Sequence, residues 1–238
     1  MIQVAGVFTA AEALMLARAG VTHVGLPLRL PVHKPDVTEA GARDIAAALA
    51  AQSTPGERAQ SVCITYVTDA GEALDLCRHL GVDGIQLHGA MPLDEARRLR
   101  AAAPGLFIIK SLVVGTTDEA ALLAQAQAYA PFVDAFLTDT FDPATGAAGA
   151  TGRTHDWDVS ARLARALPRP LILAGGLNAD NVERAVLAVR PAGVDAHTGL
   201  EDTLGVKNEA LVRRFVAGAH RAFAALDAPG LAKDCESK

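Results

Sequence analysis

The stretch Leu171–Asn181, L-I-L-A-G-G-L-N-A-D-N, decides how the rest of the chain is interpreted. Its apolar start, Leu171–Ala174, lies between a proline and the pair Gly175 and Gly176, which indicates a short buried strand that ends in a turn. Asn178 is the expected N-cap of the helical pattern that follows. Glycines let a ligand approach the backbone, and a helix start offers unpaired N–H groups, so this stretch can hold a phosphate, with Asn178 among the candidate binding residues. It is equally compatible with a tight turn that binds nothing.

Strand patterns and helix patterns alternate along the whole chain. Strands are predicted at residues 2–7, 21–26, 61–67, 84–87, 106–112, 134–138, 171–174 and 193–196. Helices are predicted at residues 10–19, 38–51, 70–80, 92–103, 118–129, 159–167 and 208–226, with one more beginning near Val182. A long Gly/Thr-rich loop is expected at residues 139–157.

This alternation predicts the fold. Short apolar strands separated by helices are typical of a parallel sheet whose outer face is covered by helices. Eight such units in 238 residues predict an α/β protein with a (β/α)₈ TIM barrel as its single domain, over residues 1–228. The alternative, an open doubly wound sheet, more often has a glycine-rich turn after its first strand, and the stretch after Val7 has none. Residues 229–238 form a polar tail that we expect to be disordered.

Composition excludes several classes of function. The net charge is −5 and no basic block is present, so we expect no nucleic-acid partner. No apolar run is long enough to span a bilayer and no leader precedes the first strand, so we expect a cytoplasmic protein without a membrane partner. Cys63, Cys77 and Cys235 are scattered without a C-x-x-C pair, which favours reduced thiols over a disulfide framework or a metal site.

The barrel fold predicts where a ligand would bind. In such barrels the site lies at the C-terminal ends of the strands, and phosphate is often held after strands seven and eight. Gly175 and Gly176 follow the seventh predicted strand, and Thr198 and Gly199 follow the eighth. Two glycine turns on neighbouring strands favour a phosphate site over an empty turn.

Other polar residues follow other strands. Asp139 comes after an apolar run and could act as a general acid or base, or else cap the adjacent loop. Gln86 and His88 are one strand period apart, so both point the same way. Either they face the pocket, with Gln86 as a candidate substrate-binding residue, or His88 only bonds the turn at Gly89. Lys110 lies in an apolar strand, where it could form a Schiff base or, as we expect, a charge pair within the barrel.

Several motifs together resemble one family. They are G-I-Q-L-H-G at residues 84–89, L-T-D-T at 137–140, G-A-T-G-R-T-H-D-W at 149–157, L-A-G-G-L-N-A-D-N-V at 173–182 and R-P-A-G-V-D at 190–195. In this order, over nearly the whole chain, they look like the phosphoribosylanthranilate isomerase family of tryptophan biosynthesis. The resemblance implies a (β/α)₈ barrel that holds the substrate's phosphate through Gly175, Gly176, Thr198 and Gly199. It also implies an Amadori rearrangement, in which an aminoaldose phosphate becomes an aminoketose phosphate without a cofactor.

The resemblance assigns two proton-transfer groups. The acid that opens the furanose ring is an aspartate matching Asp139. The base is a cysteine in a K-I-C-G-I pattern, and this chain has Q-V-A-G-V with Ala5 in its place. Loss of a general base typically costs about 10²–10⁴ in rate. Asp139 itself or one of four other residues could supply the missing base: His33, Tyr66, His88 or His197.

The substrate-recognition end also departs from the family pattern. The family's arginine after strand two has no clean match, with Arg29 and Lys34 as candidates. His197 replaces a small, serine-like residue at the phosphate turn. Three functions therefore stay open: the isomerase with a substituted base, a divergent isomerase, epimerase or lyase acting on another sugar phosphate, and a non-catalytic protein that binds a phosphorylated metabolite. The sequence does not choose between a monomer and a homodimer.

Overall fold

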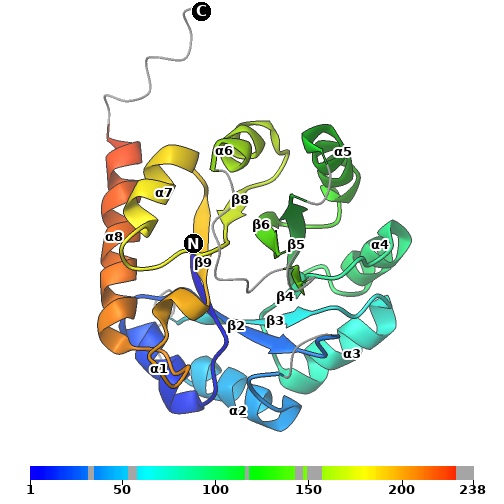
Figure 1. Ribbon diagram of the computed structural model, residues 1–238. Helices are drawn as coiled ribbons and strands as arrows, with labels where there is room; N and C mark the ends of the chain where they lie inside the picture. The colour runs from blue at the N-terminus through cyan, green and yellow to red at the C-terminus, as the bar shows by residue number, and fades with distance from the viewer. Residues whose placement is uncertain (32–34, 53–57, 116–117, 143–146, 149–156, 229–238) are drawn as a thin grey trace, which may run out of the picture.

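The computed structural model describes residues 1–31, 35–52, 58–115, 118–142, 147–148 and 157–228. In this part of the chain a ring of helices surrounds a central group of strands (Figure 1). The strands are β1 (Ile2–Ala5), β2 (His23–Leu28), β3 (Gln60–Thr65), β4 (Gly84–Leu87), β5 (Phe107–Val114), β6 (Ala135–Asp142), β7 (Ala147–Ala148), β8 (Leu171–Leu173) and β9 (Gly193–Ala196). The helices are α1 (Ala10–Arg18), α2 (Glu39–Ala50), α3 (Ala70–Leu80), α4 (Leu93–Ala102), α5 (Glu119–Tyr129), α6 (Trp157–Ala166), α7 (Val182–Val189) and α8 (Glu209–Asp227), with a 3₁₀ turn, η1, at Thr198–Leu200.

The strands close into a barrel. Neighbours follow the order β1, β2, β3, β4, β5, β6, β8 and β9, every one of these pairs is parallel, and β9 pairs with β1 to complete the circle. The short β7 is antiparallel to β6 and lies outside the circle. The closed order confirms the predicted (β/α)₈ barrel and excludes the open doubly wound sheet.

Side chains alternate between the inside of the barrel and the layer under the helices. An inner apolar cluster contains Val62, Ile109, Ala135, Leu137, Ile172 and Ala174. Intervening residues such as Ile108 and Phe136 pack outward against the helices in the larger core cluster. Because successive strand residues point to opposite faces, this alternation also determines which polar residues reach the barrel mouth.

Side-chain caps determine where several helices begin. Thr9, Thr38, Asp69 and Asp118 each accept a hydrogen bond from a backbone N–H in the first turn of the following helix. At the other end of α3, Gly81 is left-handed at φ +68°, a conformation that glycine adopts without steric cost. The predicted bounds of α3 and β4 are confirmed.

Several expectations about element ends are wrong. The N-cap of α7 is Asn181, not Asn178, because a separate turn precedes the helix and Asn178 caps that turn instead. The strand expected to end at Thr138 continues to Asp142 as β6, since it pairs with β5 up to Thr140 and with β7 beyond that residue. Pro92 is the N-cap of α4 rather than a residue of its first turn.

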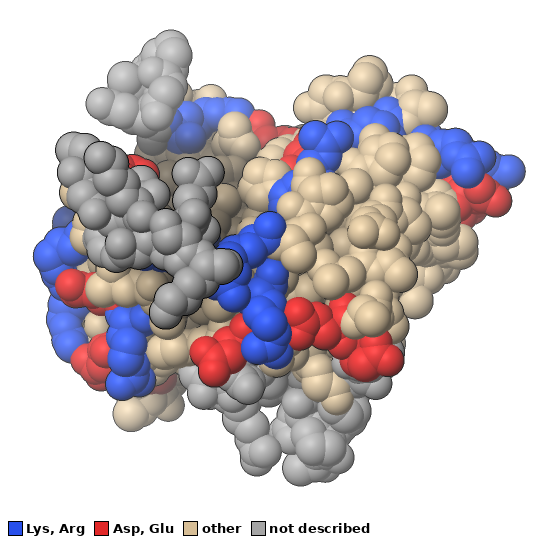
Figure 2. All heavy atoms as spheres, turned by 90° about the horizontal axis from the view of Figure 1, so that it is seen from above, with Lys and Arg blue, Asp and Glu red and all other residues tan. Residues whose placement is uncertain are grey.

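The remaining composition-based expectations concern thiols, membranes and charge. Cys63 and Cys77 are buried free thiols, while Cys235 and the predicted 229–238 tail lie outside the described residues. Among the described helices, none combines the length and apolarity needed to cross a membrane. On the face drawn in Figure 2, Lys and Arg side chains lie among Asp and Glu side chains over the coloured part of the surface.

Candidate active site

Asp139 lies at the C-terminal mouth of the barrel. It follows Leu137 and Ala135 on the inward-facing side of β6, and it is 8% exposed. Its Oδ2 is 4.0 Å from Nδ1 of His88. Burial, and then the negative charge of Asp139, raise the pKa of Tyr66 to about 12. The structure thus places this carboxyl group where the sequence predicts it, while its role as the acid stays a prediction.

His88 follows β4 and lies beside Asp139. Its Nδ1 is 3.2 Å from Oγ of Ser111, and its ring centroid is 4.8 Å from that of Tyr66. The residue is 7% exposed. Ser111 and Tyr66 therefore fix the orientation of the imidazole toward Asp139, rather than leaving it to bond the turn at Gly89.

Gln86 belongs to a hydrogen-bonded layer below the mouth. Its Nε2 donates to Oγ of Ser111 at 3.2 Å, and its Oε1 accepts from Nε2 of Gln3 at 3.0 Å. It is 2% exposed. These hydrogen bonds favour a role for Gln86 in positioning Ser111 and Gln3 over direct contact with a ligand.

Asp195 joins this layer and was not assigned a role from the sequence. Burial, and then the charge of Asp139, raise its pKa to about 7, against an opposing hydrogen bond from Gln3 and the charge of Lys207. Its Oδ1 has no hydrogen-bond partner in the described part of the chain. The alternation of β9, which turns Asp195 and Gly193 to the same side, is the sequence signal that could have identified it.

The two glycine turns lie side by side after β8 and β9. Gly175 and Gly176 both have positive φ, at +95° and +63°. A Cβ atom added at Gly199 would lie 2.2 Å from the carbonyl oxygen of Leu177, so only a glycine allows the turns to approach this closely. Within the described residues, the N–H groups of Gly175, Gly176 and Leu177 donate no hydrogen bond. Unpaired N–H groups in such a turn form a cradle for an anion.

Asn178 and Asn181 hold the first of these turns in shape. The Asn178 side-chain oxygen accepts from the N–H groups of Asp180 and Asn181 at 2.9 and 3.1 Å. In return, Asn181 donates its side-chain amide to the carbonyl of Gly176 at 2.9 Å. Asn178 therefore supports the anion cradle, and a direct contact with a ligand stays a prediction.

His197 and Thr198 connect β9 to η1. Nε2 of His197 is 3.5 Å from Oε1 of Glu201 and 3.7 Å from Oδ2 of Asp36. Burial, and then the charge of Lys207, lower the pKa of His197 below its ordinary value, although both carboxylates oppose this. Thr198 begins η1 directly beside the anion cradle, as the phosphate prediction requires.

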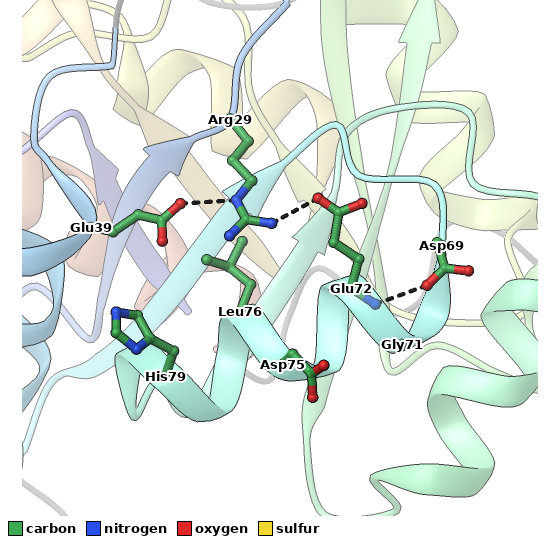
Figure 3. A pocket seen from close by; sticks show the side chains of 8 residues that line it. All are labelled: Arg29, Glu39, Asp69, Gly71, Glu72, Asp75, Leu76 and His79. Carbon is green, nitrogen blue, oxygen red and sulfur yellow. Dashed lines mark hydrogen bonds and ion pairs between the residues drawn. The ribbon is translucent and has the colours of Figure 1, made fainter.

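Arg29 lies between Glu39 of α2 and Glu72 of α3, as Figure 3 shows. It follows β2 with φ +52°, and its side chain enters a groove of about 680 Å³ between α2 and α3. Its Nε bonds Glu39 at 2.9 Å and its Nη1 bonds Glu72 at 2.7 Å. Two carboxylates already neutralise the guanidinium, so this arrangement does not favour the predicted contact with a substrate carboxylate.

Lys110 does not form the expected charge pair within the barrel. It points outward from β5, and its ammonium group donates to the carbonyl oxygens of Leu87, Gly89 and Ser111 at 3.1, 3.0 and 3.0 Å. Burial lowers its pKa to about 8. Three carbonyls, rather than the expected carboxylate, satisfy this lysine, and a Schiff base would break those bonds. Two further candidates, His33 and Lys34, lie outside the described residues.

Comparisons with known proteins agree with this geometry. A family model described as N-(5'phosphoribosyl)anthranilate (PRA) isomerase matches residues 28–218. The N-(5'-phosphoribosyl)anthranilate isomerase of Haloferax volcanii is 40% identical over 95% of this chain and 96% of its own. In Methanosarcina mazei, N-(5'-phosphoribosyl)anthranilate isomerase 2 is 34% identical over 93% of each chain.

Solved structures give the same result. The crystal structure of phosphoribosyl anthranilate isomerase from Thermotoga maritima superimposes with a TM-score of 0.74 at 26% identity, covering 92% of this chain and 98% of that one. Sequence and fold therefore agree with this family along almost the entire length. The chain belongs to the N-(5'-phosphoribosyl)anthranilate isomerase family.

Proposed function

We propose that this protein catalyses the isomerisation of N-(5'-phosphoribosyl)anthranilate, the reaction after which its relatives are named. The observation that carries the proposal is the pairing of two features at one end of the barrel. Asp139, a buried carboxyl group, lies at the same mouth as the unpaired N–H groups of the Gly175–Gly176 turn. One feature suits proton transfer and the other suits a phosphate, and the reaction needs both.

Asp139 acts as the general acid in this proposal. Its proton passes to the furanose ring oxygen, the bond between that oxygen and C1 breaks, and the nitrogen lone pair forms an iminium with C1. A positioned acid of this kind contributes about 10²–10⁴ in rate. His88, whose Nδ1 is 4.0 Å from Asp139, helps to orient the carboxyl group.

A base completes the reaction. It removes the proton from C2, the electron pair forms a C1–C2 double bond, and the iminium nitrogen becomes a neutral amine. The resulting enolamine tautomerises to the aminoketose. The steps consist of proton transfers within one substrate, so no electron acceptor or co-substrate enters the balance.

The glycine turns bind the phosphate. The N–H groups of Gly175, Gly176 and Leu177 offer donors, since they donate no hydrogen bond within the described residues. Gly199 lets the second turn, with Thr198, pack against the first. Charge-assisted bonds from backbone N–H groups to a phosphate are stronger than neutral ones.

The test is turnover of PRA by the purified protein, followed by the loss of substrate fluorescence. We expect Asp139→Asn to lower kcat about 10²–10⁴-fold with little change in KM, because the acid acts only in the transition state. Asp75→Asn is the matched control, since this aspartate on α3 has an 82% exposed side chain far from the mouth. The proposal fails if the wild-type protein turns over no PRA, or if Asp139→Asn equals Asp75→Asn.

A further inference from the structure

Ala5 leaves the proposed reaction without its family base. The residue ends β1 at 4% exposed, and its methyl group accepts no proton. The base must therefore come from a neighbour that reaches the same place in the barrel mouth. The register between β1 and β9 identifies that neighbour.

His197 directly follows the last residue of β9 that pairs with β1. The two parallel strands pair Ile2 with Val194, then Gln3 with Asp195, then Val4 with Ala196, and the next residues along the two segments are Ala5 and His197. Because alternate residues of a strand point to the same face, we expect His197 to leave β9 on the side of Asp195, as Ala5 lies on the side of Gln3. His197 therefore stands beside the position of the missing thiol.

Gly6 shows where the imidazole lies. A Cβ atom added at Gly6 would be 1.9 Å from Nε2 of His197 and 2.4 Å from its Cδ2. The ring thus occupies the space that a side chain at residue 6 would fill. Gly6 also has φ +75°, a second reason for a glycine there. The two departures from the family pattern, Ala5 and His197, are thus adjacent, and the larger side chain fills the space beside the smaller one.

Charged groups lie near the same ring nitrogen, Nε2. Nε2 faces Glu201 and Asp36, and Glu201 is itself bonded by Nζ of Lys207 at 2.5 Å. The Lys207 side chain is fully buried, and its backbone N–H donates to Oε1 of Glu12 at 2.8 Å. In a recurring enzyme arrangement, a carboxylate near one ring nitrogen stabilises the imidazolium that forms when the other nitrogen, here Nδ1, takes the proton.

We propose that His197 is the general base of this chain and removes the C2 proton in place of the family's cysteine; the inference rests on the proposed function. The C2–H bond breaks, its proton goes to the neutral imidazole, and its electron pair enters the C1–C2 bond of the enolamine. Asp139 loses one proton and His197 gains one in each cycle, and proton exchange with water restores the protonation state of both. His88 is not the base, because it lies against Ser111 and Asp139 instead of Ala5.

The first test compares His197→Gln with His220→Gln. His220 is exposed on α8, so its substitution should leave PRA turnover unchanged. We expect His197→Gln to lower kcat about 10²–10⁴-fold with KM within about threefold. A His197→Gln rate within about threefold of the wild type, outside the range of a lost base, would overturn the inference.

The second test restores the family arrangement. His197→Ser removes the ring, and adding Ala5→Cys to it supplies a thiol at the family position. The double variant should recover at least about tenfold in kcat over His197→Ser, part of the about 10²–10⁴ that a base contributes. Failure of the thiol to restore any rate would count against a base at this place.

The pH dependence of the wild-type protein tests the proposal without any substitution. Asp36, Glu201 and Lys207 are the charged groups that face His197, and its pKa lies below the ordinary value. kcat/KM should therefore fall on the acid side with a midpoint below about 6.5, the unperturbed value of histidine. This midpoint should move with temperature as that of an imidazole does, and a midpoint without that movement would indicate a carboxylate such as Asp195. A wild type without any turnover would end both proposals, whereas an active His197→Gln would end only this one.

Discussion

The two sides of the barrel mouth differ in the groups proposed to act on the substrate, which are backbone N–H groups on one side and a side chain on the other. In the proposed phosphate site, the glycine turns after β8 and β9 offer backbone N–H groups. In the proposed base site beside β1, the side chain of His197 acts next to Ala5. A backbone site depends on a few glycines, whereas a side-chain site can be rebuilt from a neighbouring strand. The variants that follow should separate the two sides.

Lys207→Met should have the largest effect, on stability. It leaves the carboxylate of Glu201, with a 17% exposed side chain, without its cation. Breaking a buried ion pair typically costs about 3–5 kcal/mol in the free energy of unfolding, which urea denaturation measures. Arg213→Met, which removes an exposed pair with Glu209, is the control. Equal stability of both variants would contradict this interpretation of Lys207.

The same variant also tests the electrostatics of the base. The positive charge of Lys207 lowers the pKa of His197, so its removal raises that pKa. The acid limb of kcat/KM should then move to higher pH. A limb that stays in place or moves to lower pH would contradict the assignment.

Gly6→Ala should lower kcat, because it displaces the ring of His197. The added methyl group overlaps Nε2 of His197 at 1.9 Å, and φ +75° is strained for alanine, so the ring must move. Misplacing a catalytic group by about 1 Å can cost roughly 10²-fold, and we expect this loss in kcat with KM nearly unchanged. Gly105→Ala is the control, because an added Cβ there contacts nothing within 4 Å. A rise in KM alone would place His197 in binding rather than catalysis.

Gly199→Ala should weaken phosphate binding and so raise KM. Its Cβ would lie 2.2 Å from the Leu177 carbonyl, which forces the two turns apart. Overpacking of this kind costs about 1–3 kcal/mol, and a loss in phosphate binding of about 1.4 kcal/mol would raise KM about tenfold. kcat should change little, opposite to Gly6→Ala. An unchanged KM would show that the phosphate is held elsewhere.

Arg29→Gln should have the smallest effect. The pairs with Glu39 and Glu72 are largely exposed, and such pairs contribute about 0.2–1 kcal/mol to the free energy of unfolding. KM for PRA should remain within about twofold, a binding change of less than about 0.5 kcal/mol. A tenfold rise in KM would instead restore Arg29 as the residue that binds the substrate's carboxylate.

Much of the fold follows from local sequence. The ends of α3 are local features, because the left-handed Gly81 and the Asp69 cap each act within a single turn. The position of Asp139 at the mouth is predictable for a similar reason, since it directly follows the apolar residues of β6. Asn178 was misplaced as a helix cap because the pattern of a short turn and the first turn of a helix look alike in one sequence.

The site's long-range contacts could not be predicted in this way. The place of His197 over Gly6 depends on the register of β1 and β9, which lie at opposite ends of the chain. Likewise, Arg29 is neutralised by Glu39 and Glu72, of which the second is 43 residues away. These pairings arise only when the barrel closes.

The decisive measurement is growth without tryptophan of a strain that lacks PRA isomerase. We expect the wild-type gene to restore growth, because His197 supplies the base, and Asp139→Asn not to restore it. If only Ala5→Cys restored growth while the wild-type protein accumulated in folded form, the barrel would be intact but without a base, and His197 would not be that base.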